Sequence, residues 1–239
     1  MTMRDFTLTI YQKLLRTLLE KGYSVRPVKE AYSTGEGKSV LLRHDVDACP
    51  LRSLAVARLE KESGVFSTFY FKTSAGSFDE PVIREIADMG HEIGYHYEDL
   101  AVCKGNYEKA IASFERNLSR IRQLYPVSTI SMDGHVLSSW NNLDLWKKYD
   151  YAKYGIRTEP YLDLDFDDYL YLTDTGRRWN AFQFSLYDKV RTKYSYRGKS
   201  TRDLISDLTR DALPARLLVT THPQRWMDDP VPWLMGASL

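Results

Sequence analysis

Two carboxylates and a guanidinium lie close together where an apolar run ends, in Arg43-His44-Asp45-Val46-Asp47. In an extended strand alternate side chains share a face, so the Arg and both Asp point to one side and the His to the other. Two carboxylates on one face repel each other unless a metal ion or the Arg lies between them. Asp47 alone could equally cap a following helix. The pair Asp45 and Asp47 together favours a functional site.

Histidines mark the ends of three other apolar runs. His96 and His222 each end one run, and Asp133-Gly134-His135 follows another. A single His is more often a hydrogen-bonded structural residue than a metal ligand. Three of the five His at the ends of separate runs, with Asp133 beside one of them, indicate a shared site.

The segment GHEIGYHYEDL (residues 90–100) is similar at first sight to the zinc-protease helix motif H-E-x-x-H, in which two His share a helix face. Here His96 follows His91 by five residues, and Gly94 lies between them. A five-residue step turns a helical side chain away from the first, and a mid-helix Gly costs about 1 kcal/mol. We therefore predict a short strand that enters a loop at His96.

Short β-rich runs alternate with longer helical patterns along the chain. The expected strands are residues 39–47, 65–71, 91–96, 128–132, 169–173 and 216–223, and the expected helices are 48–64, 79–90, 106–126, 141–149 and 201–213. This alternation, at intervals of about 25 residues, indicates right-handed βαβ units and a parallel sheet. Such sheets carry their sites at the carboxyl ends of the strands, so the residues above are expected to meet at one edge.

Composition bounds the class of protein. A chain of 239 residues is long enough for one domain, residues 1–239, in which we expect 1–38 to be a helical extension packed on the rest. A net charge of +1 gives no field that would attract nucleic acid. The two cysteines predict neither a disulfide framework nor a Cys zinc site. The N-terminus lacks the apolar core of a signal peptide and no run is long enough to span a bilayer, so the expected location is cytoplasmic.

The sequences RHDVD (43–47), GHEIGYH (90–96) and THP (221–223) together resemble the polysaccharide deacetylases with a NodB homology domain, carbohydrate esterase family four. The similarity covers roughly residues 40–223, and its first two motifs are the most specific. The resemblance implies a single-domain α/β fold, a distorted (β/α) barrel. Residues 131–151 and 169–179 also resemble a bacterial deacetylase-like subgroup found among surface-glycan genes.

The resemblance also implies roles for individual residues. Asp45 corresponds to the catalytic base and His222 to the general acid. Asp47 and His96 correspond to ligands of a divalent metal, most readily zinc, with cobalt or nickel as alternatives. His91 and Glu92 then have structural roles.

The chain departs from the family at the second His ligand, because Leu100 occupies that position. Asp47 and His96 alone do not complete a three-ligand catalytic zinc site. A third ligand could come from Glu98, or from Asp133 or His135 on the neighbouring strand end. We favour Asp133 or His135, because adjacent strands of a barrel converge there.

Substrate contacts are predicted from residue chemistry. Arg177 and Arg178 beside Trp179 could bind an anionic group and a sugar face, although Arg residues in a surface turn would fit the sequence equally well. Arg43 and Trp140 are further candidates for the substrate site.

The leading hypothesis is a metal-dependent hydrolase that removes an N-acyl group, most simply acetyl, from an amino sugar of a surface-glycan precursor. One alternative is a catalytically inactive sugar-binding or scaffold protein on the same barrel, which the missing ligand at position 100 favours. Hydrolysis of a non-sugar amide is another. Metal analysis of the purified protein would separate the first two, and nothing in the sequence fixes the oligomeric state.

Overall fold

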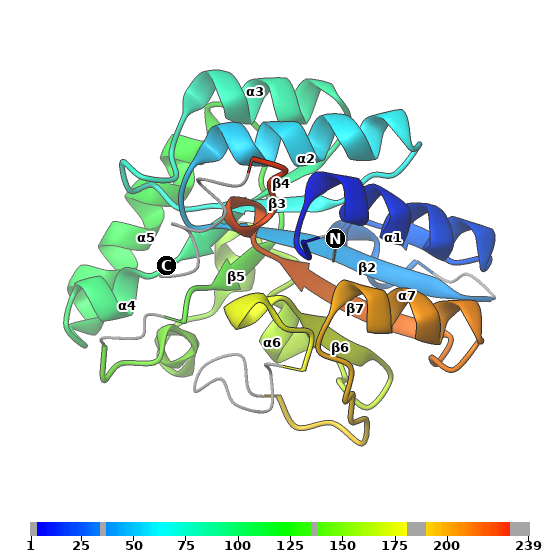
Figure 1. The fold of residues 1–239 in the computed structure, drawn as a ribbon. Coiled ribbons are helices and arrows are strands. Elements are labelled where there is room, and N and C mark those ends of the chain that lie inside the picture. The colour runs from blue at the N-terminus through cyan, green and yellow to red at the C-terminus, as the bar shows by residue number, and fades with distance from the viewer. Residues whose placement is uncertain (1–3, 34–36, 135–137, 181–189, 230–239) are drawn as a thin grey trace.

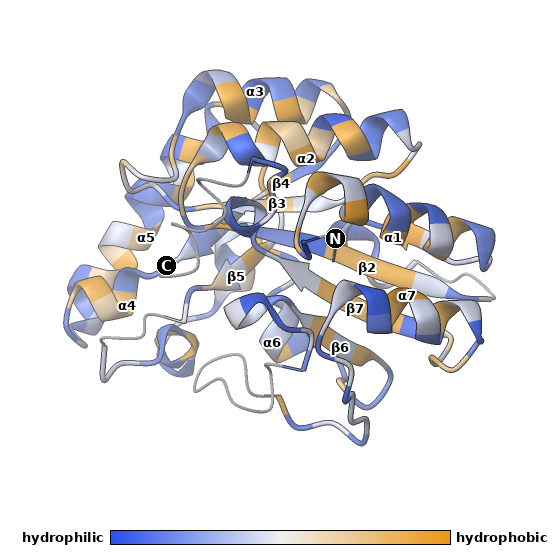
Figure 2. Cartoon of the chain, viewed as in Figure 1, coloured by the Kyte–Doolittle hydropathy of each residue, from blue (hydrophilic) through white to orange (hydrophobic). Residues whose placement is uncertain are grey.

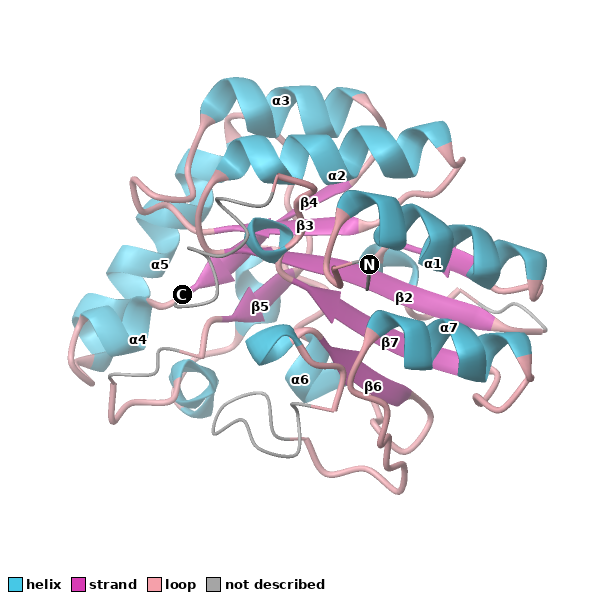
Figure 3. Cartoon of the chain, viewed as in Figure 1, coloured by secondary structure: helices cyan, strands magenta, loops and turns pink. Residues whose placement is uncertain are grey.

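The computed structural model describes residues 4–33, 37–134, 138–180 and 190–229. Strands and helices alternate along the chain, and the strands pair in parallel in one seven-stranded sheet (Figures 1 and 3). The sheet order is β5-β4-β3-β2-β7-β6, and β1 pairs with the start of β2. The strands are β1 (Ser24–Arg26), β2 (Ser39–Val46), β3 (Thr68–Phe71), β4 (Glu92–Tyr97), β5 (Ile130–Met132), β6 (Leu170–Thr173) and β7 (Arg216–Thr221).

The sheet curls into a partial barrel, and the contacts of Arg43 on β2 demonstrate the curl. Its Nε donates to Thr220 Oγ1 on the adjacent strand β7 at 2.8 Å. Its Nη1 donates to Ser131 Oγ on β5 at 2.6 Å, although β5 is three positions away in the sheet order. In a flat sheet these two strands would be about 14 Å apart, since neighbouring strands are separated by about 4.8 Å. The expected parallel, barrel-like α/β fold is confirmed.

Helices surround the outside of the curled sheet (Figure 1). They are α1 (Leu8–Glu20), α2 (Pro50–Glu62), α3 (Glu80–Asp88), α4 (Asp99–Val102), α5 (Tyr107–Arg122), α6 (Pro160–Asp163) and α7 (Thr201–Thr209). Their starts follow ordinary capping chemistry: the side chains of Asp79, Asn106 and Ser200 accept backbone N–H groups at the first turns of α3, α5 and α7. Among the described residues no helix is both long enough and apolar enough to cross a membrane.

Two elements differ from the sequence-based expectation. The segment expected as a helix at 141–149 contains the 3₁₀ helix η2 (Asn142–Lys147), a tighter form that suits short connections. The N-terminal extension contains the expected helix α1, but it also contributes β1 to the sheet. The three residues of β1, Ser-Val-Arg, are too few to show the alternation that identifies a strand in a sequence.

The hydrophobic core lies between the helices and the sheet. Val40, Leu41 and Leu42 in the first half of β2 are buried in it, whereas the second half of the strand carries Arg43 and Asp45. Figure 2 shows this division as a change from hydrophobic to hydrophilic along β2. The polar half lies at the carboxyl end of the strand, where α/β folds place their sites.

Candidate active site

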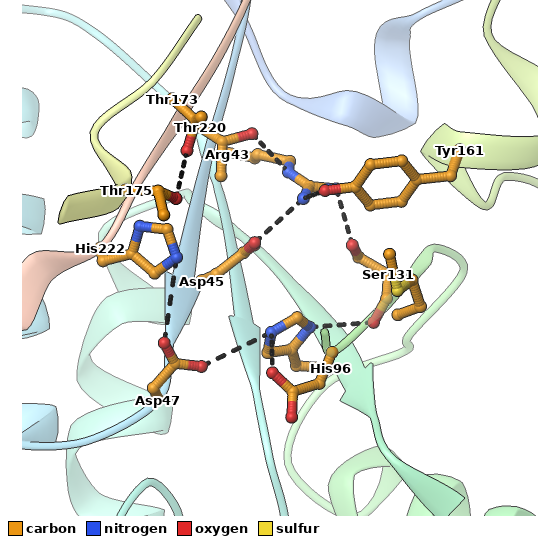
Figure 4. A network of polar contacts seen from close by, with 12 residues as sticks. Arg43, Asp45, Asp47, His96, Ser131, Tyr161, Thr173, Thr175, Thr220 and His222 are labelled. Atoms are coloured by element: carbon orange, nitrogen blue, oxygen red, sulfur yellow. Dashed lines mark hydrogen bonds and ion pairs between the residues drawn. The ribbon is translucent and has the colours of Figure 1, made fainter. Parts of the chain in front are cut away.

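Three potential metal ligands meet at the carboxyl edge of the sheet. Two of them, Asp47 and His96, are labelled in Figure 4. Asp47 follows β2, His96 lies near the end of β4, and Asp133 follows β5. His96 Nε2 is 3.6 Å from Asp47 Oδ1 and 3.5 Å from Asp133 Oδ1. One ligand atom from each residue lies within 4.8 Å of the other two. Asp47 and His96 therefore lie within the separation that a shared site requires.

The orientation of His96 leaves one ring nitrogen free to coordinate a metal. Its Nδ1 lies 2.9 Å from the carbonyl oxygen of Ser131, so this nitrogen carries the hydrogen and donates it. The other ring nitrogen, Nε2, faces the two carboxylates. A backbone carbonyl that fixes the tautomer of a ligating His is the usual outer-shell arrangement around protein-bound metals.

The donor set fits a divalent ion. One imidazole and two carboxylates suit zinc and similar ions, whose bonds to N and O are about 2 Å long. Donor atoms about 3.5 Å apart can reach such an ion with small side-chain rotations. The residues that would hold it are Asp47, His96 and Asp133.

Lys72, immediately after β3, also lies in this cluster. Its Nζ is 3.2 Å from Asp47 Oδ1, 3.0 Å from Asp133 Oδ2 and 3.9 Å from Glu98 Oε2. Burial would lower the pKa of Lys72, but the three carboxylates outweigh burial and raise it, so the amine is an ammonium ion. Burial would likewise raise the pKa of Asp47, but the charges of His222, Lys72 and His96 hold it below its ordinary value.

Asp45 is held by Arg43 and keeps one oxygen free. Arg43 Nη2 donates to Asp45 Oδ2 at 2.9 Å, and both side chains are almost fully buried. Asp45 Oδ1 is buried without a hydrogen-bond partner in the described part of the chain. A carboxylate fixed through one oxygen, with the other available, is a geometry suited to accepting a proton.

His222, directly after β7, is held by a buried carboxylate. Asp174 follows β6; its Oδ1 lies 2.6 Å from His222 Nδ1, and its Oδ2 accepts the backbone N–H of His222 at 3.0 Å. Burial and the nearby Arg225 would lower the pKa of His222, but the charges of Asp174 and Asp47 raise it above its ordinary value. His222 Nε2 lies 3.9 Å from Asp47 Oδ2, so the ring faces the metal-ligand cluster.

The other candidate ligands do not reach the cluster in the same way. Glu98 contacts Lys72 and Asp133 but is not one of the three residues whose donor atoms converge. Leu100, at the position of the missing His, is completely buried in α4. His135 lies outside the described residues.

The predicted substrate contacts need two corrections. Trp179 is 0% exposed and packs among Phe6 and Trp226, so neither of its faces is open to a sugar. Arg43 is 1% exposed, and its guanidinium donates hydrogen bonds to the side chains of Thr220, Ser131, Asp45 and Tyr161. It therefore positions Asp45 and is not open to contact a substrate. The remaining candidates lie at or near the surface: Trp140 is 41% exposed, and Arg177 and Arg178 are half-buried.

Two residues of the site, Lys72 and Asp174, were not anticipated from the sequence. Each directly follows a strand, β3 and β6 respectively. The rule that located His96 and Asp133, a polar residue at the carboxyl end of an apolar run, applies equally to both. Their signal was therefore present in the sequence.

Comparison with known proteins shows which solved structures share this fold. The sequence matches no protein-family model and no curated protein. Among solved structures, a family 4 carbohydrate esterase from Streptococcus mutans aligns with a TM-score of 0.50 and 17% identity over 84% of this chain and 79% of that chain. This chain has the fold of that esterase. The resemblance to the polysaccharide deacetylases is thus confirmed at the level of fold.

Two other solved structures are similar over most of their length. The catalytic domain of peptidoglycan N-acetylglucosamine deacetylase from Eubacterium rectale has a TM-score of 0.48 and 15% identity, with 86% of this chain and 84% of that chain covered. A family 4 carbohydrate esterase from Streptomyces lividans, in complex with acetate, has a TM-score of 0.45 and 15% identity, with 85% of each chain covered.

Proposed function

We propose that this protein is a metal-dependent N-deacetylase that acts on an amino sugar of a surface-glycan precursor. The observation that carries the proposal is the convergence of three groups at one edge of the barrel: a three-donor cation site, a carboxylate with one free oxygen, and a His–Asp pair. The shared fold with a carbohydrate esterase supports the substrate class.

The roles of the side chains follow from their contacts. A divalent metal, when bound by Asp47, His96 and Asp133, would polarise the amide carbonyl and lower the pKa of a water molecule. Asp45 Oδ1 accepts a proton from the attacking water, while Arg43 holds the other carboxylate oxygen in place.

The leaving group needs a proton of its own. As the water oxygen bonds to the acyl carbon and the C–N bond breaks, His222 Nε2 donates a proton to the departing amine nitrogen. Asp174 stabilises the protonated ring through Nδ1 and keeps Nε2 directed into the site. The products are acetate and a free amino sugar.

The rim of the site offers one exposed aromatic surface. Asn142 Nδ2 donates to the backbone oxygen of Asp133 at 2.8 Å, and Trp140 precedes Asn142 by two residues. The ring of Trp140 packs against Gly105 and remains partly exposed, and an aromatic ring of this kind suits the apolar face of a sugar.

The test is acetate release from N-acetylated amino sugars, free, oligomeric and nucleotide-linked, with the metal-free protein and with protein reloaded with zinc or cobalt. We expect release that depends on added metal and that is lost in His222→Ala. Protein with one bound metal per chain that releases no acetate from any of these substrates would contradict the proposal. Release from simple N-acetyl amides but not from sugars would assign a non-sugar substrate.

One observation favours a second candidate, a sugar-binding protein without catalysis. The ammonium of Lys72 contacts both Asp47 and Asp133 and offsets one of their two negative charges without a metal. This candidate predicts glycan binding by calorimetry that is independent of metal and of Asp45, with no acetate released.

A further inference from the structure

We propose that Lys72 is an internal cation that competes with the divalent metal for Asp47 and Asp133, and so sets the metal affinity of the site. The inference rests on the proposed metal site but not on hydrolysis. Lys72 Nζ contacts one oxygen of each carboxylate, at 3.2 and 3.0 Å, and its side chain is 13% exposed. These are two of the three residues that would hold the metal.

The Lys72 ammonium and a metal ion cannot both bind the carboxylates of Asp47 and Asp133 without electrostatic repulsion between the two cations. A metal bound to Asp47 Oδ1 at about 2 Å would lie no more than about 5 Å from Nζ, given the 3.2 Å contact. A dipositive ion and an ammonium at that separation repel each other strongly in a partly buried site. Metal binding therefore requires Lys72 to leave Asp47 and Asp133.

The structure provides a place for the displaced side chain. Glu98 Oε2 lies 3.9 Å from Nζ, beyond hydrogen-bond distance, and its side chain is 21% exposed. The backbone N–H of Lys72 donates to Ser77 Oγ at 3.0 Å, which anchors the main chain while the flexible four-carbon side chain rotates. Lys72 can thus exchange two carboxylate contacts for one with Glu98 and keep a partner for its charge.

The exchange has consequences for both states. Without metal, Lys72 relieves the repulsion between the two carboxylates and stabilises the fold. When metal binds, Lys72 loses its contacts with the two carboxylates, and this loss makes the free energy of metal binding less favourable. The site therefore binds metal more weakly than the same three ligands would without Lys72.

The experiment is a competition titration of zinc against a chromophoric chelator, with the metal-free full-length protein. We expect Lys72→Met to bind zinc at least about tenfold more tightly than the natural chain, whereas Lys109→Met, an exposed lysine of α5, leaves the affinity unchanged. We also expect a lower melting temperature for metal-free Lys72→Met and a larger rise on adding zinc.

A second variant tests the role of Glu98. Glu98→Gln should weaken zinc binding several-fold in the natural chain and have a clearly smaller effect in the Lys72→Met background, because the part of its effect that acts through Lys72 is then absent. Weakening of equal size in both backgrounds would make Glu98 a direct ligand and overturn the exchange.

The outcomes separate this inference from the proposed function. Equal or weaker zinc binding in Lys72→Met than in the natural chain would overturn the competition and leave the metal site standing. No zinc binding by either protein would overturn both. A crystal structure with cobalt that still shows Nζ within hydrogen-bond distance of Asp133 would also refute the displacement.

Discussion

At the scale of single residues, the site is organised by pairs in which one partner fixes the other. Arg43 fixes Asp45, Asp174 fixes His222, and the Ser131 carbonyl fixes His96. In each case one polar atom is used for positioning and another remains for chemistry or coordination. Such preorganisation reduces the reorganisation that a reaction requires.

The first prediction concerns the proposed base. Asp45→Asn should lower turnover by on the order of 10²–10⁴, the usual contribution of a general base, because the amide cannot accept the water's proton. Metal content, measured by atomic emission, should not change, since Asp45 is not among the three proposed ligands. Full acetate release by this variant would exclude Asp45 as the base.

The second prediction concerns the ligands. His96→Ala should abolish zinc binding in a calorimetric titration, and Asp133→Ala should weaken it by more than the 10–100-fold that is typical of outer-shell partners. Glu108→Gln, on the exposed surface of α5, serves as the control. Unchanged affinity in Asp133→Ala would move the third ligand to a residue outside the described cluster.

The site was only partly predictable at this scale, for a physical reason. Asp45, Asp47, His96 and His222 carry a family-like pattern at fixed spacing, and the alternation of β2 alone puts both Asp on one face. Trp179 illustrates the opposite case. Its neighbours Arg177 and Arg178 made it look like a surface residue, whereas contacts with Phe6 and Trp226, distant in the sequence, bury it.

At the scale of elements, the strands and helices with a clear hydrophobic period were predictable and the short ones were not. β2, β4, α3 and α5 lie where the sequence placed them, because each buries one face or is enclosed completely. β1 has three residues and pairs with only the first part of β2. Its strand conformation is a consequence of that pairing, which local sequence does not encode.

A buried polar network joins α2 to the strands on the outer side of the sheet. Glu60 on α2 contacts His44 Nε2 at 2.9 Å and accepts the Ser67 hydroxyl at 2.6 Å. His91 Nδ1 accepts the backbone N–H of Ser67, and its Nε2 lies 3.0 Å from the carbonyl oxygen of Ala57. Both ring nitrogens of His91 are therefore satisfied by the neutral form.

The third prediction is a pH dependence of stability that arises from His91. Burial lowers its pKa below the ordinary value of 6.5, although Glu60 acts in the opposite direction. Below pH 6.5 His91 binds a proton in the unfolded chain but not in the folded chain. The free energy of unfolding therefore falls as pH decreases from that value. The slope contributed is at most about 1.4 kcal/mol per pH unit.

The measurement is urea unfolding at pH values between 7.5 and 5 for the natural chain and for His91→Gln, which preserves one donor and one acceptor. The difference in stability between the two should shift in favour of the variant as pH decreases. A difference that is constant over this range would show that His91 is not held neutral.

At the scale of the whole molecule, the N-terminal segment packs against the elements that hold His222. Phe6 stacks on Trp179 and meets Trp226 edge to face, with ring centroids 6.2 and 5.1 Å away. The carbonyl oxygen of Phe6 accepts the backbone N–H of Met227. Trp226 Nε1 in turn donates to Asp174 Oδ2 at 2.6 Å, which connects this packing to the His–Asp pair.

The fourth prediction follows from this connection. Phe6→Ala should reduce the free energy of unfolding by about 3–5 kcal/mol, the usual cost of removing a buried Phe. It should also reduce turnover several-fold at a temperature where the variant is folded, because Trp226 no longer holds Asp174 as firmly. Unfolding curves and acetate release measured together test both parts.

Leu19→Ala is the matched control, since this α1 residue is 41% exposed and its removal should change neither quantity greatly. Loss of stability in Phe6→Ala with turnover fully retained would show that the aromatic cluster supports the fold alone.

The pairing of β2 with β7 determines when the site can exist during synthesis. Arg43 and Thr220, which bond across these strands, are 177 residues apart in the chain. At about 5–20 residues per second, a ribosome needs on the order of 10–35 s to extend the chain from one to the other. Throughout that interval one edge of β2 lacks its final neighbour, and Asp47 lacks its contacts with His222 and Gln224. Contacts between residues so distant in sequence also form slowly in the released chain. The carboxyl edge of this barrel, which holds the candidate site, is therefore among the last features to be completed. A nascent chain that stops before β7 leaves one edge of β2 unpaired and exposes the charged side chains of that strand.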